Sequence, residues 1–441
     1  MMQPSCQPLV DGFDTLHLRR DRRLGFIDLP RGFTILLGGL VFCLLARLQA
    51  AVDPKTAAPA IVQTVLGPKD ASHLGMVLPH EHVLVDFIGA DKVSRDRYKA
   101  DEAFAAALPF LKAFHEKGGR TLIECTPAYI GRDPALLKRL SEASGVAILT
   151  NTGYYGAAGD KFVPAHAHKE TADELAARWT KESAEGIEGT GIKPGFLKIG
   201  VDAGPLAGVD RKLITAAARC HLRTGLAIAV HTGDGEAALG IIEVLKEEKV
   251  SPEAYIWVHA QNEKDRAKHL KAAEAGAWVE FDGLSEGSLD GHVQAALDLI
   301  ERGHLGRLLF SHDAGWYHVG EPGGGKYRGY TFIFDAFLPA LKKKGITEEQ
   351  IRTLTVENPA KAFAIARRIP DGNRRGRRGR RGGRRGGGEC EAPDRRSSRE
   401  RTDGDHRRFA ASNAKRRGPP SRPPLLEPFD SLEHVSRQRT H

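Results

Sequence analysis

Histidine, lysine and aspartate side chains stand at the ends of several short apolar segments of this sequence. The six candidates are His80, His82, Lys198, His231, His259 and Asp313. Neutral imidazoles and carboxylates are good ligands for divalent metal ions. Four imidazoles and one carboxylate are enough to hold one or two such ions, so the pattern predicts a metal centre.

Lys198 is the exception among these candidates, because an ammonium group is repelled by metal ions and cannot bind them. A buried lysine has a lowered pKa and can therefore be neutral. A neutral amine can react with carbon dioxide to give a carbamate, whose two oxygens can bridge two metals. The alternative is an ordinary lysine that forms a salt bridge or extends its ammonium group into water. The residues alone leave both interpretations open.

The candidates need elements that bring them together, and the sequence alternates between two patterns. Eight short β-rich apolar runs recur, at residues 76–78, 121–125, 146–150, 196–199, 226–231, 255–259, 277–281 and 308–311. Amphipathic helical patterns lie between them, for example at residues 101–116, 172–187, 211–224 and 235–248. This alternation predicts an α/β fold, the (β/α)8 TIM barrel, with its reaction centre at the C-terminal ends of the strands.

The candidates stand where this fold requires them. Two-residue periodicity places His80 and His82 on one face at the end of the first strand. Lys198 lies in the fourth strand, and the remaining three candidates end or follow the fifth, sixth and eighth. An open, doubly wound sheet is the alternative, but no Gly-x-Gly-x-x-Gly motif follows the first strand.

The composition is that of a folded protein rather than a disordered or fibrous one. The chain has 441 residues, of which 41% are hydrophobic and 27% charged, enough apolar material for one large domain or two ordinary ones. The net charge of +9 is concentrated in residues 371–441, which hold 20 Lys and Arg against 10 Asp and Glu. Residues 54–370 hold 39 against 41, so this middle part requires no basic face for nucleic acid or membrane.

The N-terminal residues 1–53 are predicted to be a leader outside the fold. They contain arginines, an apolar run at 33–46 and alanines at 50 and 51, which is the layout of an export signal. The protein is therefore expected to be periplasmic or secreted. The apolar run is shorter than the ~20 residues of a spanning helix, so no membrane span is expected in the mature form. A mis-assigned start codon, with a cytoplasmic protein, is the alternative.

Residues 371–441 form an Arg/Gly-rich tail without the apolar periodicity of a folded domain, and we expect it to be disordered. An Arg/Gly tract can bind the phosphates of nucleic acid. A nucleic-acid-binding protein that acts through this tail is thus an alternative function, and a translated frameshift is another explanation of the tail. Residues 54–370 are left as the catalytic domain.

Several ordered motifs lie between residues 62 and 365. Among them are Leu78-Pro-His-Glu-His-Val, Gly195-Phe-Leu-Lys-Ile, Val230-His-Thr-Gly, Ile256-Trp-Val-His and Phe310-Ser-His-Asp. Together they resemble the phosphotriesterase-like enzymes of the amidohydrolase superfamily. The resemblance implies a metal-dependent hydrolase that attacks a small-molecule substrate with a hydroxide bridging two metal ions. It also implies a homodimer.

The resemblance assigns the candidates to two metal ions. His80, His82 and Asp313 would bind one ion, His231 and His259 the other, and a carbamate on Lys198 would bridge both. Zinc is the expected metal of a histidine-rich site, and manganese or cobalt can occupy the same ligands. Asp313 would also be catalytic, because it would accept the proton of the attacking hydroxide.

Departures from the family pattern bear on the bond that is cleaved. Members that hydrolyse phosphotriesters or lactones tend to carry an Asp, and a His or Arg, where this chain has Asn262 and Gly283. These departures weigh against a proton relay of the phosphotriesterase kind, with a contact between Asp282 and Asp313 as the alternative. We expect an ester, lactone or amide substrate, with phosphotriester cleavage as a side activity.

Three further residues are candidates for contact with the substrate. Tyr155 falls where lactonase-like members place a tyrosine near the metals, and a packed loop aromatic is the alternative. Lys326 and Arg328 lie in a glycine-rich loop after Asp313 that would act as a lid and hold a carboxylate or phosphate, unless it is a plain solvated loop. A phosphodiesterase or deoxyribonuclease of the same superfamily is the other enzyme alternative, although that branch typically has Glu at the position of Lys198.

Overall fold

The computed structural model describes residues 59–370. The predicted leader, residues 1–53, and the predicted tail, residues 371–441, lie outside the described residues. Within residues 59–370, no helix is long and apolar enough to cross a membrane.

Eight strands run through the centre of this domain, and each occupies one of the eight predicted apolar runs. They are β3 (Met76–Glu81), β5 (Gly119–Glu124), β6 (Ala147–Leu149), β8 (Phe196–Gly200), β9 (Ala227–His231), β10 (Tyr255–Val258), β11 (Trp278–Phe281) and β12 (Leu308–Phe310). The short β7 (Asn151–Thr152) follows β6 after one residue. Neighbours pair in parallel and in chain order, as β3–β5–β6 and as β7 to β12.

The first and last strands meet, and the sheet closes into a barrel. Between β12 and β3, the N–H of Asp313 donates to the carbonyl of His80 at 3.2 Å, and the N–H of His80 donates to Oγ of Ser311 at 3.0 Å. The N–H of His82 also donates to the carbonyl of Ala314 at 2.8 Å. Because these bonds involve predicted metal ligands, closing the barrel also brings the first and last ligands together.

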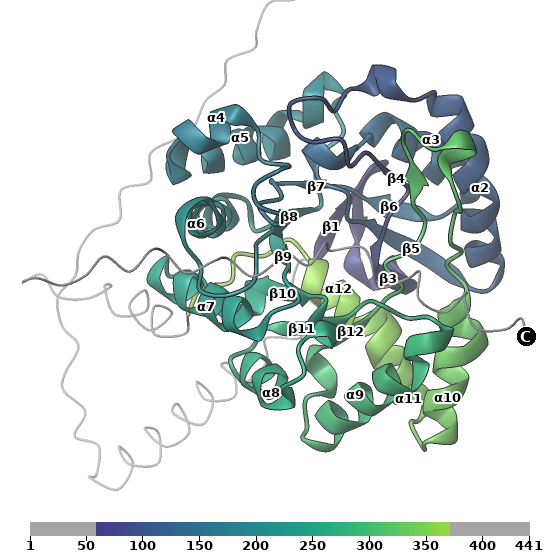
Figure 1. The fold of residues 1–441 in the computed structure, drawn as a ribbon. Coiled ribbons are helices and arrows are strands. Elements are labelled where there is room, and N and C mark those ends of the chain that lie inside the picture. Colours follow the sequence, from purple (N-terminus) through teal and green to yellow (C-terminus); the bar gives the residue numbers. More distant parts are fainter. Residues whose placement is uncertain (1–58, 371–441) are drawn as a thin grey trace, which may run out of the picture. The chain divides into compact units, whose positions relative to one another are not determined.

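Helices surround the ring of strands (Figure 1). They are α2 (Ala100–Glu116), α3 (Pro134–Ser144), α4 (Ala165–Lys169), α5 (Ala172–Glu185), α6 (Gly208–Thr224), α7 (Gly235–Glu247), α8 (Arg266–Glu274), α9 (Leu289–Glu301), α10 (Leu338–Lys343), α11 (Glu348–Arg352) and α12 (Asn358–Phe363). The four helices predicted by residue range correspond to α2, α5, α6 and α7. The predicted (β/α)8 barrel is confirmed.

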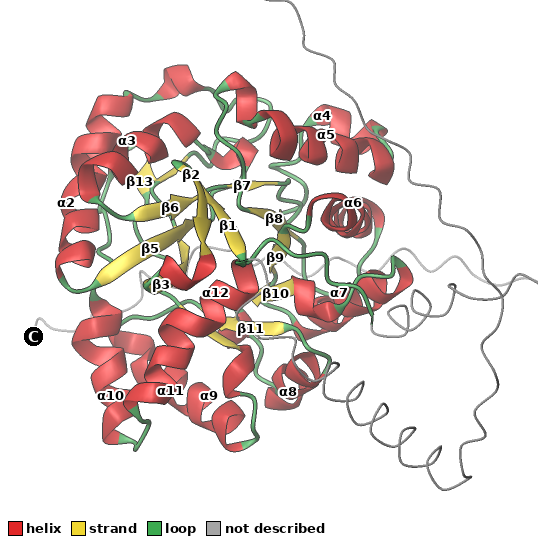
Figure 2. Ribbon diagram, turned by 180° about the vertical axis from the view of Figure 1, so that it is seen from behind, coloured by secondary structure: helices red, strands yellow, loops and turns green. Residues whose placement is uncertain are grey.

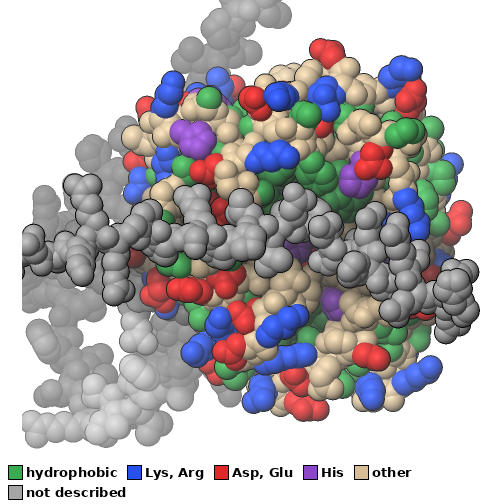
Figure 3. All heavy atoms as spheres, viewed as in Figure 1, with side chains coloured by type: hydrophobic (Ala, Val, Ile, Leu, Met, Phe, Trp, Pro, Cys, Tyr) green, Lys and Arg blue, Asp and Glu red, His purple; other side chains and the backbone are tan. Residues whose placement is uncertain are grey.

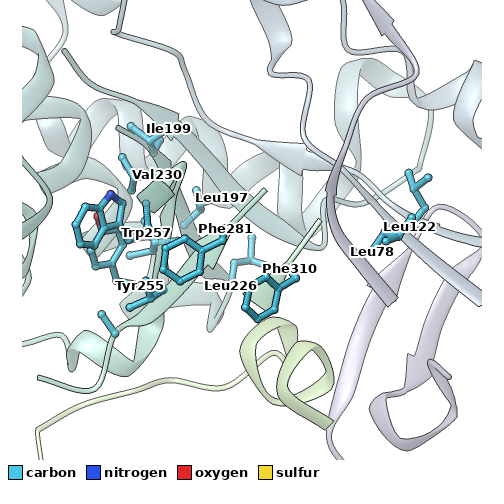
Figure 4. Close-up of a cluster of buried hydrophobic side chains, with 14 of the residues drawn as sticks. Leu78, Leu122, Leu197, Ile199, Leu226, Val230, Tyr255, Trp257, Phe281 and Phe310 are labelled. Atoms are coloured by element: carbon cyan, nitrogen blue, oxygen red, sulfur yellow. The ribbon is translucent and has the colours of Figure 1, made fainter. Parts of the chain in front are cut away.

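Outward-facing side chains of the strands form the larger apolar core. Leu197 and Ile199 of β8, Trp257 of β10 and Phe281 of β11 belong to it, and none is more than 1% exposed. Figure 4 shows them in one cluster. Burial of each such side chain stabilises the fold by ~1.5–3 kcal/mol. The outer face of the strands therefore holds the helices around the barrel.

Inward-facing side chains fill the N-terminal half of the barrel with a separate apolar cluster. Its members include Val77, Ile123, Leu149, Phe196, Ala227, Ile256 and Leu309. The hairpin of β1 (Ile61–Thr64) and β2 (Gly67–Asp70) and helix α12 lie across this end (Figure 2). Phe363 of α12 is fully buried, and its ring packs edge-on against that of Phe196, with centroids 5.3 Å apart. This end of the barrel is therefore closed by apolar groups.

Charged side chains of both signs are interspersed on the visible face of the described domain (Figure 3). This mixture agrees with the near balance of 39 basic and 41 acidic residues in residues 54–370. Mixed charge keeps a domain soluble without creating a strong field of one sign.

Candidate metal centre

The predicted ligands meet at the C-terminal end of the barrel. His80 lies on β3, Lys198 on β8 and His231 at the last position of β9. His259 directly follows β10, and Asp313 follows β12 by three residues. Side chains of a strand alternate between its two faces. Lys198 and His231 follow this alternation, since they stand two and four residues after the inward-facing Phe196 and Ala227. His80 and His259 do not, because the register of β3 shifts between Leu78 and Glu81 and the φ angle of His259 is 65°.

The first predicted ligand group is compact. The Nε2 atoms of His80 and His82 lie 3.2 Å apart. Oδ1 of Asp313 lies 3.6 Å from Nε2 of His80 and 3.1 Å from Nε2 of His82. A tetrahedral zinc ion with bonds of ~2.0–2.1 Å separates its ligand atoms by about 3.3 Å. The three atoms therefore have the spacing of ligands around one small cation.

The second predicted group lies beside the first. The ring centroids of His231 and His259 are 4.3 Å apart, and those of His259 and His80 are 5.0 Å apart. His80, His259 and Asp313 also present ligand atoms that all lie within 4.8 Å of one another. The two groups form one continuous cluster of potential metal ligands.

Lys198 is buried together with these histidines. Its side chain is 2% exposed, and no partner for its Nζ atom is found among residues 59–370. A buried amine without a partner is costly. Neither ordinary role considered from the sequence, a salt bridge or an ammonium group in water, fits these surroundings.

Burial also controls the protonation of two histidines. It lowers the pKa of His80 to about 4 and the pKa of His231 well below its ordinary value. The nearby charge of Lys198 acts in the same direction on both. Both imidazoles are therefore neutral at neutral pH, which is the form that binds a metal.

Asp282 orients two of the histidines from behind. Its Oδ2 lies 3.0 Å from Nδ1 of His80, and its Oδ1 lies 2.6 Å from Nδ1 of His259. When each Nδ1–H donates to this carboxylate, each ring keeps its Nε2 lone pair for a metal. Burial raises the pKa of Asp282, but the two histidines outweigh burial and hold this pKa well below its ordinary range.

These partners differ from the one suggested by the sequence, which was Asp313. The remaining side-chain donor to Asp282 is Gln261, whose Nε2 lies 2.7 Å from Oδ1. The neighbouring Asn262 is instead next to Gly233, where an added Cβ would lie 3.0 Å from the Asn262 side chain. Asp282 therefore contacts the predicted metal ligands His80 and His259, and no contact between Asp282 and Asp313 is found among the described residues.

Glu280 is a second buried carboxyl group at the site, and no motif pointed to it. Its Oε1 lies 3.1 Å from Nδ1 of His80, and its Oε2 has no partner among the described residues. Burial raises the pKa of Glu280 well above its ordinary value, and the charge of Asp282 adds to this effect. Burial and the neighbouring charge thus favour the protonated form of Glu280. In the sequence, the feature that could have indicated Glu280 is its position on a strand, two residues before Asp282.

Glu81 has a role that the motif around it did not reveal. It is fully buried and accepts hydrogen bonds from Oγ of Ser311 at 2.7 Å, Nδ1 of His312 at 2.7 Å and the N–H of Ala314 at 2.8 Å. Nε2 of the same His312 accepts the N–H of Ile333 at 2.9 Å. Glu81 thus fixes the segment that carries the last predicted metal ligand to the strand that carries the first.

Four aromatic side chains, Phe87, Tyr155, Phe162 and Trp316, lie next to the ligands and are called the aromatic wall below. The rings of Trp316 and His82 have centroids 4.8 Å apart. Phe87 lies between Trp316 and Phe162, at 5.6 Å and 6.1 Å, and Phe162 lies 5.8 Å from Tyr155. The wall is thus an apolar cluster beside the predicted ligands.

Tyr155 reaches a predicted metal ligand directly. Its phenol oxygen lies 2.8 Å from Nε2 of His231. Burial raises the pKa of Tyr155 well above its ordinary value, so the phenol is a neutral hydrogen-bond donor. Its ring fills the space left by Gly200, where an added Cβ would lie 2.5 Å from the ring. Gly200 therefore sets the position of this phenol.

The other two predicted substrate residues occupy different environments. Lys326 is exposed on the loop after Asp313. Arg328 is partly buried, and its guanidinium donates to main-chain carbonyls, from Nη1 to Asp313 at 3.0 Å and from Nη2 to His312 at 3.5 Å. Substrate binding by these two residues stays a prediction.

Residues 60–363 match the family described as the phosphotriesterase family. The chain belongs to the phosphotriesterase family. A phosphotriesterase homology protein from Escherichia coli is 28% identical over 294 residues, which cover 66% of this chain and 98% of that protein. As a member of this family the chain is a metal-dependent hydrolase, in agreement with the ligand cluster.

Two further relatives of this phosphotriesterase-family enzyme carry more specific descriptions. An N-acetyltaurine hydrolase from Dictyostelium discoideum is 30% identical over 280 residues, covering 59% of this chain and 73% of that protein. A variant of a PTE-like lactonase from Deinococcus radiodurans superposes with a TM-score of 0.62 at 30% identity, covering 69% of this chain and 100% of that one. Both belong to the hydrolase class assigned here.

Proposed function

We propose that this enzyme cleaves an amide, ester or lactone bond in a small molecule, with phosphotriesters as poorer substrates. The observation that carries the proposal is the phenol of Tyr155, 2.8 Å from Nε2 of His231. When that nitrogen binds a metal, the phenol loses this partner and becomes available to a substrate oxygen or nitrogen. The descriptions of the two relatives, an amide hydrolase and a lactonase, support this class of bond.

The proposed metals are two zinc ions, bridged by a carbamate on Lys198. The ligand spacing of 3.1–3.6 Å supports a small cation, and the same ligands accept manganese or cobalt. The unpartnered Nζ of Lys198 supports the carbamate. In its unprotonated form the amine would form an N–C bond with carbon dioxide and release one proton, and the new carboxylate oxygens would face cations instead of an unpartnered site.

The protein side chains divide the remaining work. When bound, two cations lower the pKa of a water molecule between them and polarise the scissile carbonyl. Asp313 is ionised, because its contacts with His82 and His80 outweigh burial and hold its pKa below the ordinary value, so it can accept the proton. Asp282 keeps its two histidines in the ligating tautomer. The aromatic wall excludes water and receives the apolar part of the substrate.

The decisive experiment is a hydrolysis screen of purified protein together with elemental analysis. N-acyl amino acids and N-acyl aminosulfonates, lactones, aryl esters and phosphotriesters are assayed with zinc-, manganese- and cobalt-loaded protein. We expect close to two metals per chain, and kcat/KM at least about 10-fold higher for the best carbonyl substrate than for any phosphotriester. One metal per chain or fewer, or a preference for phosphotriesters, contradicts the proposal.

Two further proposals rest on the sequence and the family resemblance. Residues 1–53 would direct export, and fractionation of cells that express the full chain with a C-terminal tag tests this prediction. The catalytic domain would form a homodimer, which light scattering of the purified protein tests. A cytoplasmic protein of full length would contradict the first proposal, and a monomer at micromolar concentration would contradict the second.

A further inference from the structure

Asp313 has an unusual backbone conformation, and both its N–H and its carbonyl form hydrogen bonds. Its φ angle is 52°, in the left-handed region that residues other than glycine rarely adopt. Its N–H donates to the carbonyl of His80 at 3.2 Å. Its carbonyl accepts two side-chain hydrogen bonds, from Nε1 of Trp316 at 2.8 Å and from Nη1 of Arg328 at 3.0 Å.

Both side-chain donors come from the loop of residues 314–330, and this loop is itself fixed to the site. Gly315 and Arg328 exchange two backbone hydrogen bonds, of 3.1 Å and 2.9 Å. The hydroxyl of Tyr330 donates to the carbonyl of His82 at 2.6 Å. Gly315 lies so close to the same carbonyl that an added Cβ would be 1.8 Å from its oxygen. The loop is therefore anchored to the backbone of two metal ligands, unlike a free lid.

A left-handed backbone at a non-glycine residue is strained and persists only where its surroundings stabilise it. Relaxation of Asp313 to the usual right-handed or extended region would rotate the Cα–Cβ bond. The carboxylate would then leave its place 3.1 Å from Nε2 of His82. The indole N–H and the guanidinium fork oppose this relaxation, because both are aimed at the carbonyl that would have to turn.

We propose that Arg328 and Trp316 are positioning residues that hold the Asp313 carboxylate in its ligating and proton-accepting position. The proposal rests on the proposed function of Asp313. It replaces the substrate-binding role expected for Arg328 from the sequence. A guanidinium suits this task because its rigid fork reaches two successive carbonyls, those of His312 and Asp313, at once.

The test compares three variants of the full-length protein. Arg328→Met removes the fork at similar length, Arg328→Lys keeps one cationic donor, and Trp316→Phe removes the indole N–H but keeps an aromatic ring. Arg302→Met is the matched control, since Arg302 is exposed at the C-terminal end of α9. For each protein we measure metal loss to EDTA by elemental analysis, and kcat and KM on the best substrate of the screen.

Loss of a group that orients a metal ligand typically lowers metal affinity or activity ~10–100-fold. We therefore expect Arg328→Met to lose metal at least about 10-fold faster and to lower kcat by a similar factor, with KM within about 3-fold of wild type. Arg328→Lys should recover part of both effects, Trp316→Phe should accelerate metal loss, and Arg302→Met should match wild type.

Three results overturn the proposal. A raised KM with unchanged kcat and unchanged metal loss would make Arg328 a substrate-binding residue. Wild-type behaviour of both Arg328→Met and Trp316→Phe would show that the side-chain hydrogen bonds to the Asp313 carbonyl are dispensable. If Arg328→Met does not fold, a wild-type rate of metal loss in both Arg328→Lys and Trp316→Phe likewise overturns the proposal. Wild-type protein that binds metal but hydrolyses nothing contradicts the proposed function alone. The rate of metal loss still reports how well Arg328 and Trp316 hold Asp313 in place.

Discussion

The two halves of the barrel interior are built from the same strands but contain opposite kinds of side chain. On β8, the inward-facing Phe196 and Lys198 stand two residues apart, and they are 0% and 2% exposed. Phe196 packs in an apolar cluster closed by Phe363. Lys198 has no hydrogen-bond partner among the described residues and lies among predicted metal ligands.

Along each strand, the residues that stabilise the fold and the residues suited to chemistry therefore occupy different halves of the barrel. In the N-terminal half, burial of apolar groups stabilises the fold without any ligand. In the C-terminal half, buried imidazoles, carboxyl groups and an amine have few partners except one another, and such groups are costly until a cation or a substrate satisfies them. Substitutions in the two halves should therefore have opposite consequences, and the following predictions test this.

The largest expected effect is on stability, at the apolar end. Phe196→Ala should lower the free energy of unfolding by ~3–5 kcal/mol, because it removes a fully buried ring and leaves a cavity next to Phe363. The metal content of the folded fraction should be unchanged. Chemical denaturation and elemental analysis measure the two quantities, and Leu66→Ala, at a residue 52% exposed, is the control. Loss of metal without loss of stability would contradict the assignment of stability to the apolar half of the barrel.

Lys198→Met, two residues along the same strand, should do the reverse. Without the bridging oxygens, we expect the metal content to fall and kcat/KM to drop at least about 100-fold. The unfolding midpoint of the metal-free protein should stay the same or rise, because a buried amine without a partner is replaced by an apolar side chain.

Lys193→Met, at an exposed lysine just before β8, is the control for this change. Activity of Lys198→Ala should be partly restored by short carboxylic acids that can occupy the bridging position. An unchanged metal content and rate in Lys198→Met would sink the carbamate hypothesis while leaving the fold assignment intact.

A smaller effect is expected for Asp282→Asn, which keeps the shape of the side chain but removes its charge. The amide no longer favours the Nδ1–H tautomer of His80 and His259, so metal affinity should fall about 10–100-fold, equivalent to ~1.4–2.7 kcal/mol. Zinc titration with a competing chelator measures the loss. Asp290→Asn, at an exposed residue of α9, should bind zinc like wild type. Equal affinities of the two variants would remove Asp282 from the site.

The smallest effect concerns pH. Burial lowers the pKa of His221, outside the barrel on α6, to about 4, and lowers that of His80 to about 4 as well. Their ordinary value is 6.5, so between pH 6.5 and pH 4 the unfolded chain binds more protons than the folded one. Stability of the metal-free protein is then complete above pH 6.5 and falls as the pH drops towards 4.

Between pH 6.5 and pH 5.5 the expected loss is roughly 1 kcal/mol for each of these two histidines. Urea denaturation of metal-free protein at a series of pH values measures this slope. His221→Gln should remove the contribution of one of the two histidines to this pH dependence of the free energy of unfolding. An identical slope in this variant would mean that His221 is not the neutral, buried group described here.

The amino-acid sequence was sufficient to predict the elements and a set of candidate metal ligands. Alternation of apolar runs and amphipathic stretches fixed eight strand and helix units, because secondary structure follows from local periodicity. The ends of these strands carry His80, His231 and Asp313, and parallel strands in a barrel point their C-terminal ends to one side. A set of ligands at strand ends could therefore be read without knowing which strands are neighbours.

Tertiary structure alone decided how the ligands are held. Asp282 contacts a histidine 202 residues away, and Glu81 fixes Ala314 across 233 residues. The side chain of Arg328 donates to the carbonyl of Asp313, which no spacing in the sequence indicates. The contacts of Asp282 with His80 and of Glu81 with Ala314 join segments that become adjacent only when the ring of strands closes. No local segment therefore contains the information that places Asp282 and Glu81, whereas Arg328 meets Asp313 15 residues away within one loop.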